Sequence, residues 1–168
     1  FSATVVGIMA SDDFVNGVTY LHEGAKKLIN CDAIISTIPL PDLVKAFPGE
    51  RAGHIVHCAE ALGFRAIRFL NILVDMPDVS DNTWMYVSER RYIMTRIQEP
   101  KRRSSFNAPQ GKTSIMLEIP CNENDEIWNY SRERLLGQCV ADLKALWIDI
   151  EGMVIDCFIN GVTHGYPV

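Results

Sequence analysis

The chain has 168 residues, with 16 basic and 21 acidic side chains, so its formal net charge at pH 7 is −5. Hydrophobic residues make up 48% of the sequence and charged residues 22%, the balance of a globular domain with a packed core. This composition excludes a disordered or collagen-like chain. The negative net charge argues against a general electrostatic grip on nucleic acid or on anionic lipid, so we expect no nucleic-acid partner.

Both ends of the sequence resemble cuts through folded structure. The chain opens with Phe1 rather than an initiator Met, shows no targeting segment, and stops at Val168 directly after an apolar stretch. We therefore expect a piece of a larger protein.

Five widely spaced cysteines indicate the redox environment of the protein. They are Cys31, Cys58, Cys121, Cys139 and Cys157. An odd number without C-x-x-C spacing argues against a disulfide framework or a zinc site and favours small buried side chains in a reducing cytoplasm. We predict a cytoplasmic protein, and peripheral membrane association of the full-length protein stays open.

The first forty residues have the pattern of a three-strand meander. Residues 3–9 are rich in Val and Ile, and residues 18–22 alternate between apolar and polar. Residues 11–17 between these strands are turn-forming, and Asn16-Gly17 is the strongest hairpin signal among them. The third strand would run from residues 28–29 through residues 33–35, and its nearly continuous apolar character is typical of a strand buried on both faces.

Two helices are expected next, over residues 42–47 after Pro41 and over residues 51–62. The apolar face of the second helix would comprise Ile55, Cys58, Ala59 and Leu62. His54 and His57 lie three residues apart on this helix and could reach one metal ion. No carboxylate-rich segment accompanies them, so we favour surface histidines and predict no metal site.

The rest of the chain is dominated by strands and one long helix. The predicted strands cover residues 65–76, with a phase change near Asn71 that suggests a bulge, and residues 83–87, 92–97, 113–119 and 153–159. The helix covers residues 131–148, with Ser131 as N-cap and an apolar stripe of Leu135, Cys139, Leu143 and Trp147. The predicted class is α+β, a mostly antiparallel mixed sheet packed by a long amphipathic helix.

Aromatic and basic side chains on these strands are the candidate ligand contacts. Trp84 and Tyr86 share one face of a strand, where they could form a core or rim patch or a surface for a flat ligand. Arg96 could face a ligand cavity or form an ion pair with a carboxylate such as Glu99 or Glu118.

Two further groups of basic residues could have a structural or a ligand-binding role. Arg65 and Arg68 also lie in or beside a predicted strand, where a buried charge must be paired. The basic loop residues 101–103 could be solvated or could contact a phosphate or carboxylate.

The sequence holds no Gly-x-Gly-x-x-Gly, no phosphate-loop Lys, no HExxH and no Gly-x-Ser-x-Gly, and therefore no self-contained catalytic motif.

One segment resembles a motif of a known protein superfamily. Residues 31–40, C-D-A-I-I-S-T-I-P-L, resemble the A-D-x-V-I-S-T-x-P-L stretch of the FAD-dependent amine oxidase and protoporphyrinogen oxidase superfamily, whose relatives include phytoene desaturases and UDP-galactopyranose mutases. Segments at 69–75, 84–87, 95–101, 118–121 and 165–168 follow in the order typical of that superfamily. The resemblance covers nearly the whole chain.

The resemblance implies that residues 1–40 are the terminal strands of an FAD-binding domain and residues 41–168 a substrate-binding domain. FAD would accept a hydride from a small-molecule substrate, and the protein would hold and orient both. In this superfamily the position of Val5 contacts the adenine end of FAD through its backbone, so the resemblance assigns Val5, Val6 and Pro39 to the cofactor, with the Pro39 end near the substrate side. The predicted substrate contacts are the residues singled out above from their own pattern, Arg96, Trp84 and Tyr86.

The sequence also departs from the superfamily pattern. The dinucleotide fingerprint is missing, and neither Lys101 nor Lys112 lies in the kind of segment that places a lysine beside the flavin. We therefore expect the chain alone to bind FAD very weakly and to be inactive. Its expected partner is the remaining FAD-binding domain of the same protein, and whether the protein forms a homo-oligomer stays open. The alternatives are a UDP-galactopyranose mutase-like flavoenzyme and a non-catalytic binding module.

Overall fold

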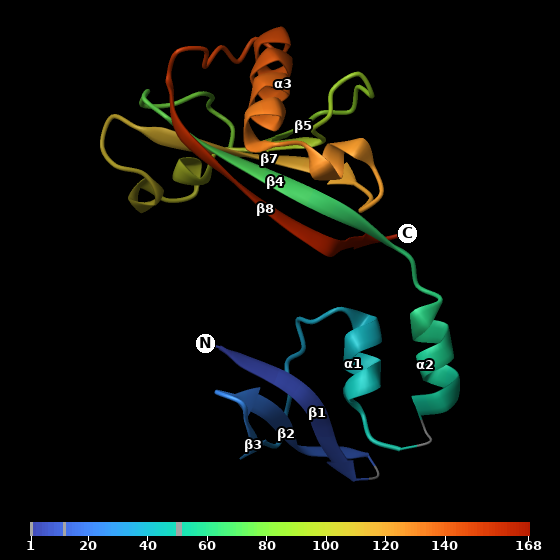
Figure 1. Cartoon of the computed structure of the whole chain (residues 1–168). Helices are drawn as coiled ribbons and strands as arrows, with labels where there is room; N and C mark the ends of the chain where they lie inside the picture. Colours follow the sequence, from blue (N-terminus) through green and yellow to red (C-terminus); the bar gives the residue numbers. More distant parts are fainter. Residues whose placement is uncertain (1, 12, 50–51) are drawn as a thin grey trace. The chain divides into compact units, whose positions relative to one another are not determined.

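The chain divides into two units, Phe1–Gly63 and Phe64–Val168, in a computed structural model that describes residues 2–11, 13–49 and 52–168 (Figure 1). The division follows the packing of the elements within each unit. The predicted functional boundary at residue 40 concerns ligand binding rather than packing, so it stays a prediction.

The N-terminal unit is a three-stranded antiparallel sheet with two short helices. Its strands are β1 (Ala3–Ser11), β2 (Phe14–His22) and β3 (Ala25–Asn30), in that order across the sheet. Helices α1 (Leu40–Ala46) and α2 (Ala52–Glu60) lie side by side (Figure 1). The predicted strand and helix types are confirmed here, while Arg51, the predicted start of the second helix, lies outside the described residues.

The predicted turn segment 11–17 contains the hairpin turn, but Asn16-Gly17, its strongest signal, lies inside β2 and not at the turn, so that part of the prediction was wrong. The chain reverses between Ser11 and Phe14, which are partners in the β1–β2 ladder. Asn16 is the extra residue of a bulge opposite the Met9–Ala10 step. A Cβ at Gly17 would lie 2.4 Å from the carbonyl oxygen of Ile29, so the glycine permits the close approach of β3.

The third strand is shorter and more exposed than its apolar sequence suggests. All six residues of β3 are exposed, and residues 33–35 form no strand, with Ile35 94% exposed. Among the described residues β3 pairs only with β2. The prediction of burial on both faces was therefore wrong for this chain, because no second strand or covering layer lies against this edge within the described part.

The apolar face predicted for the second helix is only partly buried. Ala59 is buried in α2, whereas Ile55, Cys58 and Leu62 are exposed. The side chain of His54 lies outside the described residues, so the two-histidine alternative with His57 stays untested.

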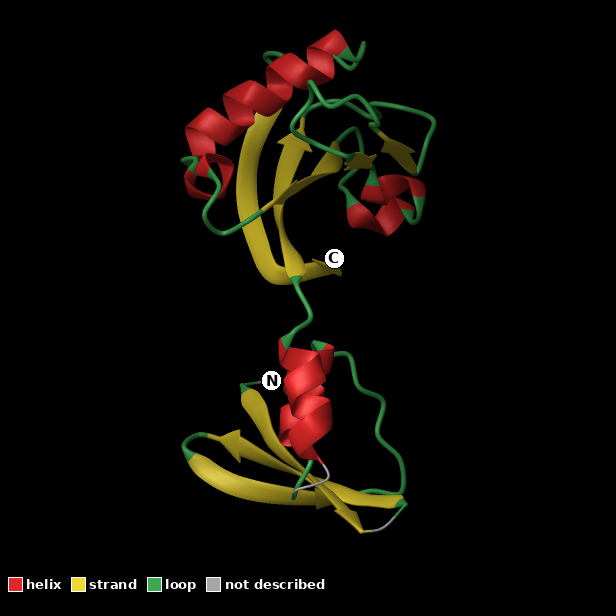
Figure 2. Ribbon diagram, turned by 90° about the vertical axis from the view of Figure 1, so that its right-hand side faces the viewer, coloured by secondary structure: helices red, strands yellow, loops and turns green. Residues whose placement is uncertain are grey.

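The C-terminal unit is a five-stranded antiparallel sheet with one long helix across a face (Figure 2). The strand order is β5-β6-β7-β4-β8. The strands are β4 (Phe64–Val74), β5 (Trp84–Tyr86), β6 (Arg96–Gln98), β7 (Thr113–Cys121) and β8 (Val154–Pro167), and the helix is α3 (Arg132–Ala145). Three 3₁₀ turns lie in the connections, η1 (Pro100–Arg102), η2 (Ser105–Asn107) and η3 (Glu126–Asn129). The predicted α+β class is confirmed.

The core of this unit lies between the sheet and α3. Fully buried side chains include Leu70 and Ile72 of β4, Leu117 of β7, and Leu135 and Leu143 of α3. The alternation predicted for residues 113–119 is confirmed, since Ile115, Leu117 and Ile119 are all buried against this helix side. The predicted strand over 92–97 is reduced to Arg96–Gln98, and Tyr92 and Met94 are buried in the connection between β5 and β6 instead.

The predicted bulge near Asn71 was wrong, because β4 pairs in continuous register with β7 from Ala66 to Val74 and with β8 from Ile67 to Leu73. The apparent phase change has another cause. Arg68 occupies a core-facing position in the buried row, and its Nη1 donates to the carbonyl oxygens of Ile127 at 2.7 Å and Tyr130 at 3.0 Å. The prediction that this buried charge must be paired is confirmed, with backbone carbonyls as the partners.

Helix α3 begins as predicted and ends earlier than predicted. Ser131 Oγ accepts from the backbone N–H of Arg134 at 3.2 Å, which is the geometry of an N-cap. Leu135, Cys139 and Leu143 are fully buried. Trp147 is 96% exposed, so its predicted place in the apolar stripe was wrong, because the helix ends at Ala145 before that residue is reached.

Candidate functional site

A hollow of about 600 Å³ in the N-terminal unit collects the three residues that the sequence assigned to a cofactor. Val5 and Val6 from β1, and Pro39 before α1, are among the residues around it. The others are Ala3, Thr4, Ile38, Asp42, Lys45 and Ala46. Val5 and Val6 thus line one concave surface with Pro39, which lies more than thirty positions further along the sequence.

Four consecutive residues of β1, Ala3 to Val6, line this hollow. β1 is the outer strand of the β1-β2-β3 order, so one of its edges has no strand partner among the described residues. Val6 is the extra residue of a bulge, because Val5 pairs with Tyr20 while Gly7 pairs with Thr19. The backbone N–H and C=O groups at a strand edge can bind a flat polar ring whatever side chains the strand carries.

The charged groups around the hollow nearly cancel. Asp42 lies in the first turn of α1, and Lys45 forms an ion pair with Glu60 at 3.3 Å. α1 starts without a side-chain cap, and the N–H groups of Asp42 and Leu43 both donate to the carbonyl oxygen of Pro39 at 3.0 Å. The hollow thus fits an uncharged flat ring better than a pyrophosphate, which needs unpaired cationic or N–H donors.

The second candidate site is the sheet face of the C-terminal unit that points away from α3, called the open sheet face below. Its position follows from the register, since residues directly opposite each other share a face. Trp84 lies opposite Gln98, and Tyr86 lies opposite Arg96, which in turn lies opposite Glu118. The intervening Ile97 and Leu117 belong to the core on the α3 side. The prediction that Trp84 and Tyr86 share a face is confirmed, and both are exposed.

A buried carboxylate organises the open sheet face. Glu118, 4% exposed, accepts from Arg96 Nη2 at 2.6 Å and from Gln98 Nε2 at 2.7 Å. Tyr166 of β8 donates to the same carboxylate at 3.2 Å and accepts from Arg96 at 3.1 Å. The guanidinium carbon of Arg96 lies 5.6 Å from the ring centroid of Tyr86. Of the two alternatives for Arg96, the ion pair with Glu118 is therefore present, on a face that also carries exposed aromatic rings.

The charges on this face affect each other's protonation. The hydrogen bond to Glu118 raises the pKa of Arg96 above its ordinary value, against the opposing effect of burial. Burial, and next the charge of Glu118, raises the pKa of Tyr166. Arg96 thus stays cationic and Tyr166 stays a neutral hydrogen-bond donor at neutral pH.

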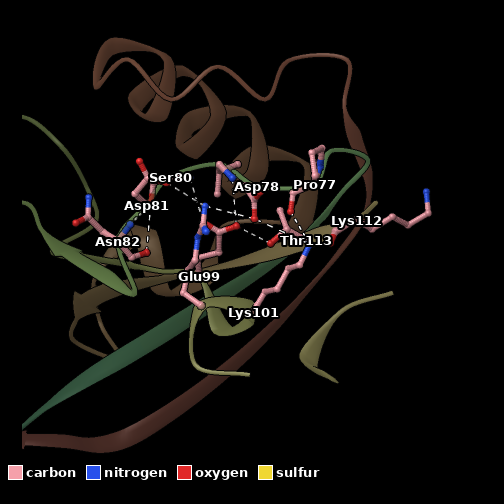
Figure 3. A network of polar contacts seen from close by, with 11 residues as sticks. Pro77, Asp78, Ser80, Asp81, Asn82, Glu99, Lys101, Lys112 and Thr113 are labelled. Atoms are coloured by element: carbon pink, nitrogen blue, oxygen red, sulfur yellow. Dashed lines mark hydrogen bonds and ion pairs between the residues drawn. The ribbon is translucent and has the colours of Figure 1, made fainter. Parts of the chain in front are cut away.

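Two of the three loop residues Lys101, Arg102 and Arg103 are engaged by acceptors in a separate network (Figure 3). Lys101 Nζ donates to the carbonyl oxygens of Pro77 at 2.7 Å and Lys112 at 3.1 Å. Arg102 lies 3.3 Å from Asp78, 3.5 Å from Asp81 and 3.7 Å from Glu99. These two cations hold the loops together rather than face a ligand.

Arg103 differs from its two neighbours and belongs to the open sheet face. Its Nη2 donates to Gln98 Oε1 at 2.7 Å, and its guanidinium carbon lies 5.7 Å from the centroid of the Trp84 ring. Sequence reasoning grouped Arg103 with the loop and did not connect Gln98 or Tyr166 with the site. The two-residue period of a strand could have indicated that Gln98 shares a face with Arg96. The contacts of Arg103 and Tyr166 depend on the folded loop and on the strand register, which no local pattern shows.

Two further features are absent from the described ranges, a metal-binding cluster and a membrane-spanning helix. No group of three or more His, Cys, Asp or Glu side chains comes together there as a metal ion would require. None of the helices within those ranges has the length and apolar character needed to cross a bilayer.

Solved structures share the fold of this chain, although sequence comparisons find no relative. No protein-family model matches the chain, and no curated protein is detectably similar to it in sequence. Among solved structures, a reduced UDP-galactopyranose mutase matches 91% of this chain at 19% identity with a TM-score of 0.67. A putative protoporphyrinogen oxidase from Exiguobacterium sp. 255-15 matches 99% of the chain at 19% identity with a TM-score of 0.60. A triple mutant of putrescine oxidase, from a redesign of its cofactor binding, matches 94% at 11% identity with a TM-score of 0.59.

The chain spans about a third of the length of each of these proteins, since it covers 33%, 35% and 33% of them in turn. At these identities the likeness concerns the fold. The resemblance drawn from residues 31–40 and the segments after them is confirmed at that level: the chain has the fold of a portion of FAD-dependent amine oxidase, protoporphyrinogen oxidase and UDP-galactopyranose mutase structures.

Proposed function

We propose that the chain is part of an FAD-dependent oxidoreductase, in which it supplies one wall of the cofactor site and the face that receives the substrate. The observation that carries the proposal is the fold match to a putative protoporphyrinogen oxidase over 99% of this chain and 35% of that one. Two placements support it: Val5, Val6 and Pro39 line one hollow, and Trp84, Tyr86 and Arg96 share the open sheet face.

The hollow fits one end of the cofactor. Its apolar valines and the unpaired edge of β1 suit a flat heterocycle such as adenine, whose rim carries hydrogen-bonding groups. Asp42 and the paired Lys45 give no comparable support to a pyrophosphate. When bound, FAD would accept a hydride from the substrate, and this chain's residues would hold the heterocycle and position the substrate. The remaining FAD-binding domain of the same protein would hold the phosphates.

The proposal is tested by expressing the complete open reading frame beside the 168-residue chain. We expect the complete protein to carry a Gly-x-Gly-x-x-Gly motif before the position of Phe1 and to purify with the absorption spectrum of bound flavin. The 168-residue chain should purify colourless. A complete protein without the motif and without flavin would overturn the proposal in favour of a non-catalytic binding module.

A hollow-filling variant tests the assignment of the cofactor wall. In the complete protein, Ala46→Phe places a ring among the lining residues and should lower the flavin content after dialysis. Ala25→Phe, at the exposed start of β3 and away from the hollow, is the matched control and should keep it. Equal flavin retention in both variants would place the cofactor elsewhere.

A mutase-like flavoenzyme is the second candidate, because a UDP-galactopyranose mutase shares the fold with a TM-score of 0.67. Such an enzyme would rearrange a sugar nucleotide without net oxidation. Binding of a UDP-sugar and of a porphyrinogen to the complete protein separates the two candidates, since each predicts tight binding of only one compound.

A further inference from the structure

Arg103 has unused hydrogen-bonding capacity at the edge of the open sheet face. Within the described ranges no carboxylate forms an ion pair with it, whereas its neighbours are all engaged. Arg96 is paired with Glu118, Arg102 with Asp78, and Lys101 with two backbone carbonyls. A guanidinium carries five N–H donors, and Arg103 uses one nitrogen, Nη2, for its bond to Gln98.

This arginine is nevertheless held in a fixed position. Gln98 is 6% exposed, and its Nε2 donates to Glu118, which turns its Oε1 toward Arg103 at 2.7 Å. The guanidinium carbon of Arg103 lies 5.7 Å from the centroid of the Trp84 ring on β5, within the range of a cation–π contact. A buried acid, a buried amide and an aromatic ring thus preorganise one cation, so little side-chain entropy remains to be lost when it binds a ligand.

The surrounding charge favours an anion. Arg96 and Arg103 contribute two positive charges, and Glu118 contributes one negative charge that Arg96 already neutralises. Beside them Trp84 is 50% exposed and Tyr86 is 73% exposed, two flat rings that a ligand's apolar body could cover.

We propose that Arg103 recognises the carboxylate or phosphate of a small molecule whose flat ring lies over Trp84 and Tyr86. The guanidinium donates two N–H groups to the two oxygens of the anion, in the bidentate geometry that planar oxyanions accept. The inference deepens the proposed function and rests on its assignment of this face to the substrate: the substrate is an acid with a ring system, and a cationic amine is disfavoured.

The test uses the 168-residue chain and three probes with the same ring, 2-naphthoate, neutral 2-naphthamide and cationic 2-naphthylmethylamine. Affinity is measured by calorimetry, and the site is located by the indole N–H resonances of Trp84, Trp128 and Trp147 in the NMR spectrum. We expect only 2-naphthoate to bind measurably and to shift the Trp84 resonance. Uridine diphosphate and inorganic pyrophosphate, used as further probes, separate a phosphate-bearing ligand from a carboxylate-bearing one.

Variants assign the effect to the guanidinium. Arg103→Gln should weaken 2-naphthoate binding by about tenfold to a hundredfold, the range for losing hydrogen bonds to a charged group. Arg103→Lys should recover only part of the affinity, because an ammonium cannot bind bidentately. Arg134→Gln removes one positive charge from α3, on the other side of the sheet, and should leave binding unchanged.

Two results would overturn the proposal: equal binding of the ammonium and carboxylate probes, or an Arg103→Gln variant that is folded by NMR and binds like the parent chain. The measurement needs no flavin, so a failure here leaves the flavin content of the complete protein as an independent test of the proposed function.

Discussion

Thr113 donates from Oγ1 to Oε1 of Glu99 over 2.7 Å, and both residues are 2% exposed. The same carboxylate accepts from the backbone N–H groups of Val79 at 3.2 Å and Ser80 at 3.0 Å (Figure 3). One buried acid thereby ties the loop after β4 to the first residue of β7. Such a charge is tolerated in the interior because hydrogen-bond donors satisfy its oxygens.

We expect Thr113→Val to destabilise the C-terminal unit by about 1–3 kcal/mol, because valine keeps the shape but removes a donor to a buried carboxylate. Urea unfolding measures the change. Thr163→Val is the matched control, since among the described residues that hydroxyl is hydrogen-bonded only to its neighbour His164, and the substitution should cost less than about 0.5 kcal/mol. Equal effects of the two substitutions would show that the Glu99 network contributes no stability.

Trp147 holds a strained backbone position at the end of α3. Its φ is +66°, and the surrounding bonds form a Schellman motif: Ile148 N donates to Leu143 O at 2.9 Å and Trp147 N to Lys144 O at 3.1 Å. Glycine is the residue that occupies this position without a Cβ penalty. We expect Trp147→Gly to stabilise the chain by about 0.5–1 kcal/mol in thermal or urea unfolding.

Trp147→Ala is the control that separates backbone strain from loss of the ring. Alanine keeps the strained φ, and the indole is 96% exposed, so its removal should change stability by less than about 0.5 kcal/mol. A stabilisation by alanine as large as that by glycine would show that the exposed ring, and not the backbone, is unfavourable.

Local sequence patterns predicted the elements that depend on short-range physics. The alternation of Ile115, Leu117 and Ile119 requires only the two-residue period of a strand, and the Ser131 cap requires only a hydroxyl before a helical stripe. The same local signal failed at Asn16-Gly17, because a bulge and a turn favour the same residues, and only the pairing of β2 with β1 and β3 distinguishes the two.

Long-range contacts explain the remaining differences between the sequence-based predictions and the structure. Arg68 appeared to interrupt a strand because its partners, the carbonyl oxygens of Ile127 and Tyr130, lie about sixty positions away in the chain. For the candidate site, the two-residue period correctly joined Trp84 to Tyr86, but the role of Arg103 depends on which way the amide of Gln98 points. No periodicity encodes that orientation.

Cys139 predicts how stability changes at alkaline pH. Burial raises the pKa of its thiol from an ordinary 9.0 to about 12. Above pH 9 the unfolded chain loses this proton while the folded chain keeps it, so the folded state becomes less favoured as pH rises. We expect the free energy of unfolding to fall between pH 9 and pH 12 by about 1.4 kcal/mol per pH unit from this group.

Cys139→Ala is the control for that slope, since it removes the thiol and leaves the other titrating groups. Burial also raises the pKa of the Cys121 and Cys157 thiols, so the variant should retain a shallower fall. Urea unfolding of both chains across this pH range measures the difference. Parallel curves would mean that Cys139 is accessible to water in the folded chain.

The packing of α3 on its sheet gives the last prediction. Leu143 is fully buried in the cluster that joins α3 to the sheet, while Ala141, two residues earlier on the same helix, is exposed. Leu143→Asp would leave a carboxylate without a partner among aliphatic side chains, at a cost of several kcal/mol, and should abolish the cooperative thermal transition of residues 64–168. Ala141→Asp introduces the same charge in the same helix and should lower stability by no more than about 1 kcal/mol. Circular dichroism melting of both variants provides the comparison, and an unchanged melting temperature for Leu143→Asp would show that this stripe of α3 does not form the core.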